Sequence, residues 1–155
     1  MNATPAPSHI GILVFDLEAS LRFYTEGLGF SDLHSLTVGG PQFGALYEFD
    51  DFECEVHFLK NGTLVVEVIH LTSPQPTAWA GREPLNVTGI GQLAFRVDDA
   101  DEVAGRLARL GGKVLEHTRT PTVGPDGVER TFIACLDPDG IRIQLMEGDL
   151  PDAVR

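Results

Sequence analysis

Two stretches of the chain carry the same pattern of hydrophobic and polar positions. Residues 8–30 (SHIGILVFDLEASLRFYTEGLGF) lie over residues 91–113 (GQLAFRVDDADEVAGRLARLGGK) at a constant shift of 83. Each stretch opens with alternating apolar residues, which are typical of a strand, passes an Asp, and continues with apolar residues at helical spacing. This internal repeat predicts a strand followed by a helix in each half of the chain.

The predicted helices have recognisable ends. Asp16 and Asp99 stand where a side chain can accept hydrogen bonds from the first free N–H groups, and Asp99 with Glu102 matches a capping box. Gly29 and Gly112 close the two helices, because glycine readily adopts the left-handed turn that ends a helix.

A second correspondence lies downstream, between residues 58–70 (FLKNGTLVVEVIH) and residues 134–147 (ACLDPDGIRIQLME). Each segment is a strand, a hairpin turn signal (Asn-Gly or Asp-Gly) and a second alternating strand. Each half therefore reads β-α-β-β-β. We expect an α+β fold built from two paired βαβββ modules.

The same pattern predicts a single domain over residues 1–155. The first module spans 8–70 and the second 90–147. Between them, residues 71–89 contain three prolines and little periodicity, which indicates a surface linker, and 148–155 form a C-terminal tail.

One segment within the second module is rich in Pro and Gly, at residues 120–129 (TPTVGPDGVE). Long loops in compact domains are often functional, so a lid or a substrate-contacting loop is one interpretation. The other interpretation is an insertion that the fold merely tolerates.

Composition and charge narrow the possible partners. A chain of 155 residues buries roughly 70% of its unfolded surface, so it needs no metal merely to hold it together. The net charge of −12 argues against nucleic acid and anionic membranes as partners, because both are polyanions.

The sequence also favours the cytoplasm. No stretch approaches 18 apolar residues, and the N-terminus has no positively charged region of the secretory type. Cys54 and Cys135 lie in predicted strands, where two buried thiols suit a reducing compartment better than a disulfide framework does.

Candidate chemistry follows from strand parity. In the first strand the alternate apolar residues face the helix, so His9 faces away from it, and Gln92 takes the equivalent position in the repeat. Glu67 and Gln144 are polar residues between apolar neighbours in the last strand of each module, so they face the opposite side of the sheet from those neighbours. Four symmetry-related polar positions result.

With these motifs the sequence resembles the vicinal oxygen chelate superfamily, which includes glyoxalase I, methylmalonyl-CoA epimerase, extradiol dioxygenases and the bleomycin and fosfomycin resistance proteins. The resemblance runs from Ser8 to Glu147 and rests on the opening HIGILVFDLEASLRFYTEGLGF, its repeat GQLAFRVDDADEVAGRLARLGG, and the ending CLDPDGIRIQLME, which is similar to the family's DPDG-x-x-[EQ] hairpin. The first half, with GPQFGALYEF, looks closer to the methylmalonyl-CoA epimerase-like branch than to the glutathione-dependent glyoxalases.

The resemblance implies a divalent metal ion (Zn, Ni, Co, Mn or Mg) bound by His9, Glu67, Gln92 and Gln144. The chain departs from the family pattern, which commonly has His and Glu at the two second-module positions that are Gln here. The set carries one formal negative charge, so we expect a weak, exchangeable site. Extradiol chemistry is disfavoured, because Gln92 replaces the second His of the facial triad that holds Fe(II).

The function implied by the resemblance is a metal-dependent epimerase, isomerase or lyase. Its substrate would lose a proton next to a carbonyl, and the metal would stabilise the resulting enediolate or enolate. Glu67 is the expected base, with Glu147 or His57 as alternatives. A homodimer is expected, with the substrate groove within one chain or across the dimer.

Three further side chains are candidate substrate-binding residues. Arg96 and Arg142 share the parity of the two Gln residues and could hold a carboxylate or phosphate, or lie at the rim. His57, in the third strand, is a candidate acid or base.

Other interpretations remain open at this point. His9 could be a packed or surface residue, and Glu67 could pair with Arg96 or Arg142. The alternative function is a metal-independent protein that sequesters a small molecule such as an antibiotic, as the resistance members of the superfamily do.

Overall fold

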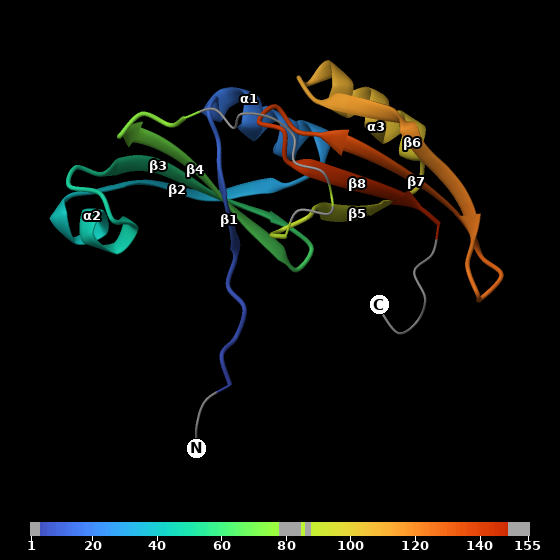
Figure 1. Ribbon diagram of the computed structural model, residues 1–155, viewed down its shortest axis with the longest axis horizontal. Helices are drawn as coiled ribbons and strands as arrows, with labels where there is room; N and C mark the ends of the chain where they lie inside the picture. The colour runs from blue at the N-terminus through green and yellow to red at the C-terminus, as the bar shows by residue number, and fades with distance from the viewer. Residues whose placement is uncertain (1–3, 78–84, 86–87, 149–155) are drawn as a thin grey trace. The chain divides into compact units, whose positions relative to one another are not determined.

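The computed structural model describes residues 4–77, 85 and 88–148 (Figure 1). The chain divides into two compact units, Met1–Ala78 and Trp79–Arg155. Each unit contains one four-stranded sheet.

In the first unit the sheet has the strand order β1-β4-β3-β2. The short β1 pairs with β4 in parallel, and the remaining neighbours are antiparallel. The elements are β1 (Ile10–Leu13), α1 (Leu17–Arg22), the π-helical turn η1 (Phe23–Gly27), β2 (Ser31–Gly39), α2 (Pro41–Tyr47), β3 (Glu53–Asn61) and β4 (Leu64–Ser73).

The second unit repeats this topology, with the strand order β5-β8-β7-β6 and a parallel β5–β8 pair. Its elements are β5 (Leu93–Val97), α3 (Ala100–Arg109), β6 (Lys113–Val123), β7 (Glu129–Leu136) and β8 (Arg142–Glu147). The prediction of an α+β fold with two βαβββ modules is confirmed.

Both predicted helix starts have the expected caps. Asp16 Oδ1 accepts a hydrogen bond from the Ala19 N–H at 3.0 Å, and Asp99 Oδ1 accepts one from the Glu102 N–H at 2.8 Å. The Glu102 carboxylate accepts instead from Arg106 Nη1 at 2.9 Å, one turn further along α3.

The first helix ends in a wider turn than periodicity alone predicts. After α1 the chain continues through η1, where the Thr25 hydroxyl donates to the Leu21 carbonyl at 2.7 Å. Phe23 and Tyr24 are fully buried in this turn, and Gly29 follows with φ of 73°. Packing of the two aromatic rings therefore accompanies the departure from regular α-helix.

Apolar residues of the sheets form the core. Val66 and Val68 of β4 and Ile143 and Leu145 of β8 have no exposed surface. Cys54 and Cys135 are buried free thiols, as expected, and burial raises the pKa of Cys135 to about 11.

Strands extend into the segments predicted to be a linker and a loop. β4 runs to Ser73, three residues into the predicted linker 71–89. Residues 120–123 belong to β6 and residue 129 to β7, so the predicted loop 120–129 is reduced to residues 124–128. The rest of the linker lies largely, and the tail after residue 148 wholly, outside the described residues.

The shortened loop is fixed by an ion pair. Arg130, 7% exposed, donates from Nη1 and Nη2 to the two carboxylate oxygens of Asp126, at 2.9 and 2.6 Å. These hydrogen bonds hold the pKa of the Asp126 carboxyl well below its usual range. The tip of this hairpin is therefore braced in the structure by a bidentate contact.

The helix α2 was not predicted. Pro41 occupies the first turn, where its missing N–H is not needed. At the other end Glu48 adopts φ of 64°, and the Phe49 N–H donates to the Gly44 carbonyl at 2.9 Å. A Cβ on Gly44 would lie 2.6 Å from the Phe49 carbonyl oxygen, so this tight closure requires glycine.

Within the described residues, no helix has the length and apolar character needed to cross a membrane.

Candidate functional site

His9 and Glu67 meet on the face of the first sheet that lies opposite the fully buried Val66 and Val68. His9 immediately precedes β1, and the parallel register aligns Gly11 with Glu67 of β4. His9 Nε2 lies 3.1 Å from Glu67 Oε2, and the two side chains are 35% and 15% exposed. The pair is thus partly shielded but reachable from solvent.

Neighbouring groups orient the His9 ring. Its Nδ1 lies 3.0 Å from the Ser8 hydroxyl, and its edge meets the Phe58 ring with centroids 5.4 Å apart. When the Nδ1–H donates to Ser8, Nε2 is left with a lone pair that points at the Glu67 side. This is the tautomer that a metal ligand requires.

The geometry of this pair fits a shared cation. Neighbouring ligand atoms of an octahedral ion with bonds of about 2.1 Å lie about 3.0 Å apart. The Nε2–Oε2 separation of 3.1 Å matches that spacing. A Cβ on Gly11 would lie 3.5 Å from Glu67 Oε2, so the glycine leaves space beside the carboxylate.

The equivalent residues of the second module are also in contact. Gln92 immediately precedes β5, and Gln144 of β8 aligns with Ala94. The Gln92 Nε2 amide donates directly to Gln144 Oε1, and both side chains are half-buried. For both amide oxygens to face one ion, the Gln92 amide must turn over, because it now presents its nitrogen.

Each module therefore brings its two predicted positions together, one pair ionisable and the other neutral. Over residues 4–77, 85 and 88–148, no group of three or more His, Cys, Asp or Glu side chains is placed to hold a metal ion.

The two arginines lie on the same face of the second sheet as Gln144. Arg142 is two residues before Gln144 on β8 and is half-buried. Arg96 is exposed on β5, where it aligns with Met146. Glu67 pairs with His9.

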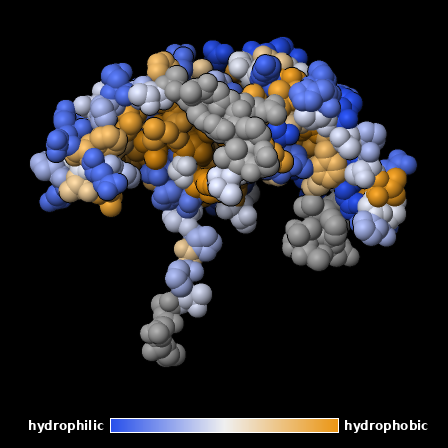
Figure 2. Space-filling view, in the orientation of Figure 1, coloured by the Kyte–Doolittle hydropathy of each residue, from blue (hydrophilic) through white to orange (hydrophobic). Residues whose placement is uncertain are grey.

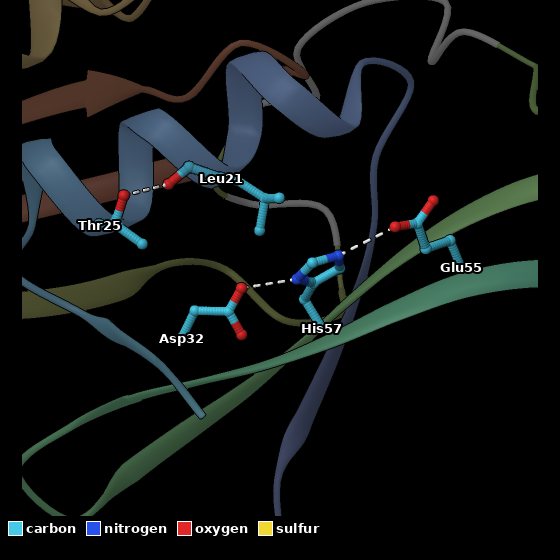
Figure 3. A network of polar contacts seen from close by, with 5 residues as sticks. All are labelled: Leu21, Thr25, Asp32, Glu55 and His57. Carbon is cyan, nitrogen blue, oxygen red and sulfur yellow. Dashed lines mark hydrogen bonds and ion pairs between the residues drawn. The ribbon is translucent and has the colours of Figure 1, made fainter. Parts of the chain in front are cut away.

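The structure does not bring His57 to the His9–Glu67 face. On β3 it is Phe58 that aligns with Glu67, so His57 points to the opposite side of the sheet, below α1 and η1 (Figure 3). There its ring lies between two carboxylates, 2.7 Å from Asp32 Oδ2 and 3.1 Å from Glu55 Oε1. Burial acts to lower the pKa of His57, but the two carboxylates raise it overall.

Glu147, the other alternative base, lies on the opposite side of the second sheet from Gln144. Its Oε2 accepts a hydrogen bond from the Ala100 N–H at 2.9 Å, at the start of α3. Of the two candidate bases in the first unit, Glu67 shares a face with His9 and His57 does not.

Several neighbours of the pair were missed in the sequence. Phe58 could have been found, because the alternation in ECEVHFL puts it on the Glu67 face. Tyr47 had no such signal, since it lies on the unpredicted α2. Burial and then the charge of Glu67 raise the pKa of the Tyr47 hydroxyl.

Solved structures share this fold. A glyoxalase family protein from Bacillus cereus superposes with a TM-score of 0.80 at 21% identity, covering 95% of this chain and 96% of that one. The fosfomycin resistance protein FosX from Listeria monocytogenes, in complex with Mn(II) and sulfate, superposes with a TM-score of 0.61 at 17% identity, covering 99% of this chain and all of FosX.

Sequence comparison gives the family. A lactoylglutathione lyase from Salmonella typhimurium is 30% identical over 142 residues, 90% of each chain. A probable lactoylglutathione lyase from Synechocystis is 29% identical over 140 residues, covering 90% of this chain and 92% of the relative. Residues 6–145 match the family description, and the chain therefore belongs to the Glyoxalase/Bleomycin resistance protein/Dioxygenase superfamily.

Proposed function

We propose that the chain is a metal-dependent lyase or isomerase that removes a proton next to a carbonyl of a small substrate. The observation that carries this proposal is the contact between His9 and Glu67 on an accessible sheet face. The similarity to lactoylglutathione lyases supports the lyase class. An epimerase remains a narrower prediction based on the resemblance of the first half.

The residues that would hold the ion are His9, Glu67, Gln92 and Gln144, from one chain or from two copies. The 3.1 Å spacing in the first pair suits two ligands of one ion, whereas the second pair must first give up its hydrogen bond. The bound ion would act as a Lewis acid that stabilises negative charge developing on the substrate. With a single carboxylate, the set favours weak binding of Zn, Ni, Co, Mn or Mg.

Glu67 is the proposed base. Its Oε2 faces His9, which leaves Oε1 for the substrate proton. Arg96 and Arg142 are proposed to bind a carboxylate or phosphate of the substrate, because both lie on the Gln144 face of the second sheet. His57 is not proposed as a substrate ligand, because it lies on the other face of its sheet.

Deuterium exchange tests this function directly. A panel of α-hydroxyketones and α-branched thioesters is incubated in D2O with the metal-loaded protein, and NMR follows loss of the α-proton signal. We expect metal-dependent exchange that Glu67→Gln abolishes. The matched control is Glu147→Gln, whose amide oxygen still accepts from Ala100 and whose exchange should persist. Exchange that survives Glu67→Gln would remove Glu67 as the base.

A second candidate function is metal-independent binding of a small molecule, such as antibiotic sequestration. The Gln92–Gln144 hydrogen bond favours it, because the two amides satisfy each other without a metal. Saturable binding of a cationic antibiotic such as bleomycin by chelator-treated protein, with no turnover, would select this function.

We also propose a cytoplasmic homodimer. The buried free thiols of Cys54 and Cys135 suit a reducing compartment. Light scattering of the purified chain tests the dimer.

A further inference from the structure

The strand β2 is an open edge of the first sheet. It stands last in the order β1-β4-β3-β2, and its backbone pairs on one side only, with β3. Every residue of β2 except Val38 is exposed, and Leu33 and Leu36 are 59% and 38% exposed. Among the described residues, no other segment hydrogen-bonds to the outer edge of β2, so its N–H and C=O groups there can pair with a further strand.

The equivalent edge strand of the second module is protected against such pairing. β6 loses its register with β7 between Leu115 and Thr120. Arg119, inside this irregular stretch, pairs with Asp101 of α3, and Pro121 supplies no backbone N–H. Bulges, charged side chains and proline are the means by which natural sheets keep an edge from pairing. β2 contains no Lys, Arg or Pro, so its edge lacks the protection that β6 has.

Charge also distinguishes β2 from the rest of its module. Residues 1–78 carry ten acidic side chains against two basic ones, Arg22 and Lys60, so two copies of this module repel each other overall. Figure 2 shows hydrophilic residues over much of the visible surface. β2 contributes one acid, Asp32, whose carboxylate lies 2.7 Å from Nδ1 of His57. The rest of the strand carries no carboxylate or ammonium group, so β2 is a nearly neutral edge in an acidic module.

The sequence of β2 suits pairing with its own copy. Ser35 is the midpoint of Ser31–Gly39, so antiparallel pairing about a twofold axis at Ser35 overlaps the whole strand. In that register Asp32 faces Val38 of the second copy, and no like charges stand opposite each other. The Leu36 side chains of the two copies become diagonal neighbours about 7–8 Å apart, which covers part of their exposed surface.

We propose that β2 pairs in antiparallel fashion with β2 of a second copy of this chain, about a twofold axis at Ser35. The two four-stranded sheets then join edge to edge. Because the axis is perpendicular to the joined sheet, the Glu67 face of each copy lies on the same side. Glu67 stands on β4, two strands away from the new pair, and stays open. This inference rests on the homodimer of the proposed function and is independent of the metal and the reaction.

A cysteine at the proposed axis tests the pairing by trapping it. Directly opposite residues of an antiparallel pair have Cα atoms about 4.5–5.5 Å apart, which is within the range of a disulfide. Oxidation should therefore convert Ser35→Cys to a covalent dimer at least about tenfold faster than Thr122→Cys. Thr122 is the matched control because it is exposed on the other edge strand, β6. Wild type should give no covalent dimer, since its two thiols are buried.

Like charges at the axis test the same interface without a covalent bond. One strand pair buries less than the roughly 1,200 Å² of standard interfaces, so we expect a dimer that depends on concentration. Sedimentation equilibrium from about 10 μM to 1 mM covers this range. Ser35→Lys sets two ammonium groups opposite each other and should weaken association about tenfold. Ser35→Thr should associate like wild type, and Thr122→Lys, with the same charge on β6, should have no effect.

The outcomes separate this inference from the proposed homodimer. A dimer that forms by sedimentation, resists Ser35→Lys and is not trapped by Ser35→Cys would overturn the β2 interface alone. A monomer at every concentration, with Ser35→Cys trapped no faster than Thr122→Cys, would overturn the interface and the homodimer together. Circular dichroism melts establish that each variant is folded. If Ser35→Lys fails to fold, the trapping rate of Ser35→Cys decides the result.

Discussion

The carboxylates on either side of His57 make the stability of the first module depend on pH. The His57 side chain is 12% exposed, whereas Asp32 and Glu55 are 38% and 46% exposed, so solvent screens each ion pair. Pairs of this kind contribute about 0.2–1 kcal/mol each. We expect His57→Gln to lower the free energy of unfolding by about 1 kcal/mol at pH 6.

The direction in which the stability changes with pH follows from the direction of the His57 pKa shift. The folded protein holds the pKa of His57 above its unfolded value of 6.5. The stabilisation from protonated His57 is therefore fully present below pH 6.5 and is lost as the pH rises through the folded pKa. The difference between wild type and His57→Gln should be largest near pH 6 and should shrink toward pH 9.

Urea unfolding at pH 6, 7, 8 and 9 measures this difference, since each transition yields a free energy by linear extrapolation. His34→Gln is the control, because His34 is exposed on β2 and faces the other side of the sheet. A His57→Gln difference that stays constant from pH 6 to pH 9, or grows with pH, would refute the ion-pair reasoning.

Three other substitutions test the backbone and the caps, each followed by thermal and urea unfolding. Gly105→Ala in α3 should stabilise by roughly 0.5–1 kcal/mol, because helical glycine is costly and the nearest atom to the new Cβ, Arg109 Nη1, would lie 3.6 Å away. Gly44→Ala should destabilise by about 1–3 kcal/mol, since the new Cβ would lie 2.6 Å from a backbone oxygen. Asp99→Ala removes the cap of α3 and should cost about 1 kcal/mol, while Asp99→Asn should restore most of it.

The sequence predicted the fold because its signals were local and repeated. Each Asp cap, each closing glycine and each hairpin turn occurs twice at equivalent positions, so one half supports the interpretation of the other. Strand parity predicted the facing of His9 and Glu67 in the same way, since the side-chain period of two is fixed by the backbone.

The features that escaped prediction depend on contacts between distant residues. The seven residues of α2 are too few to establish a helical period, and the helix is held by Phe52 and by the tight turn at Gly44. The only property that makes His57 a candidate acid or base in the sequence is its imidazole side chain. Applying parity to β3 would have placed it with Glu55 on the side away from Glu67.

The His9–Glu67 and Gln92–Gln144 pairs show how a duplicated module can diverge in charge without altering its scaffold. In both halves the residue before the first strand touches the middle of the last strand, on the face turned away from the helix. The residues behind each pair are fully buried and apolar, Val66 and Val68 in the first module and Ile143 and Leu145 in the second. His and Glu can therefore stand in for two amides on the outer face without a change in the packing behind them. The duplication thus leaves a neutral amide pair in the second module and an imidazole–carboxylate pair in the first, so a later substitution in one module can change its chemistry while the other stays as it is.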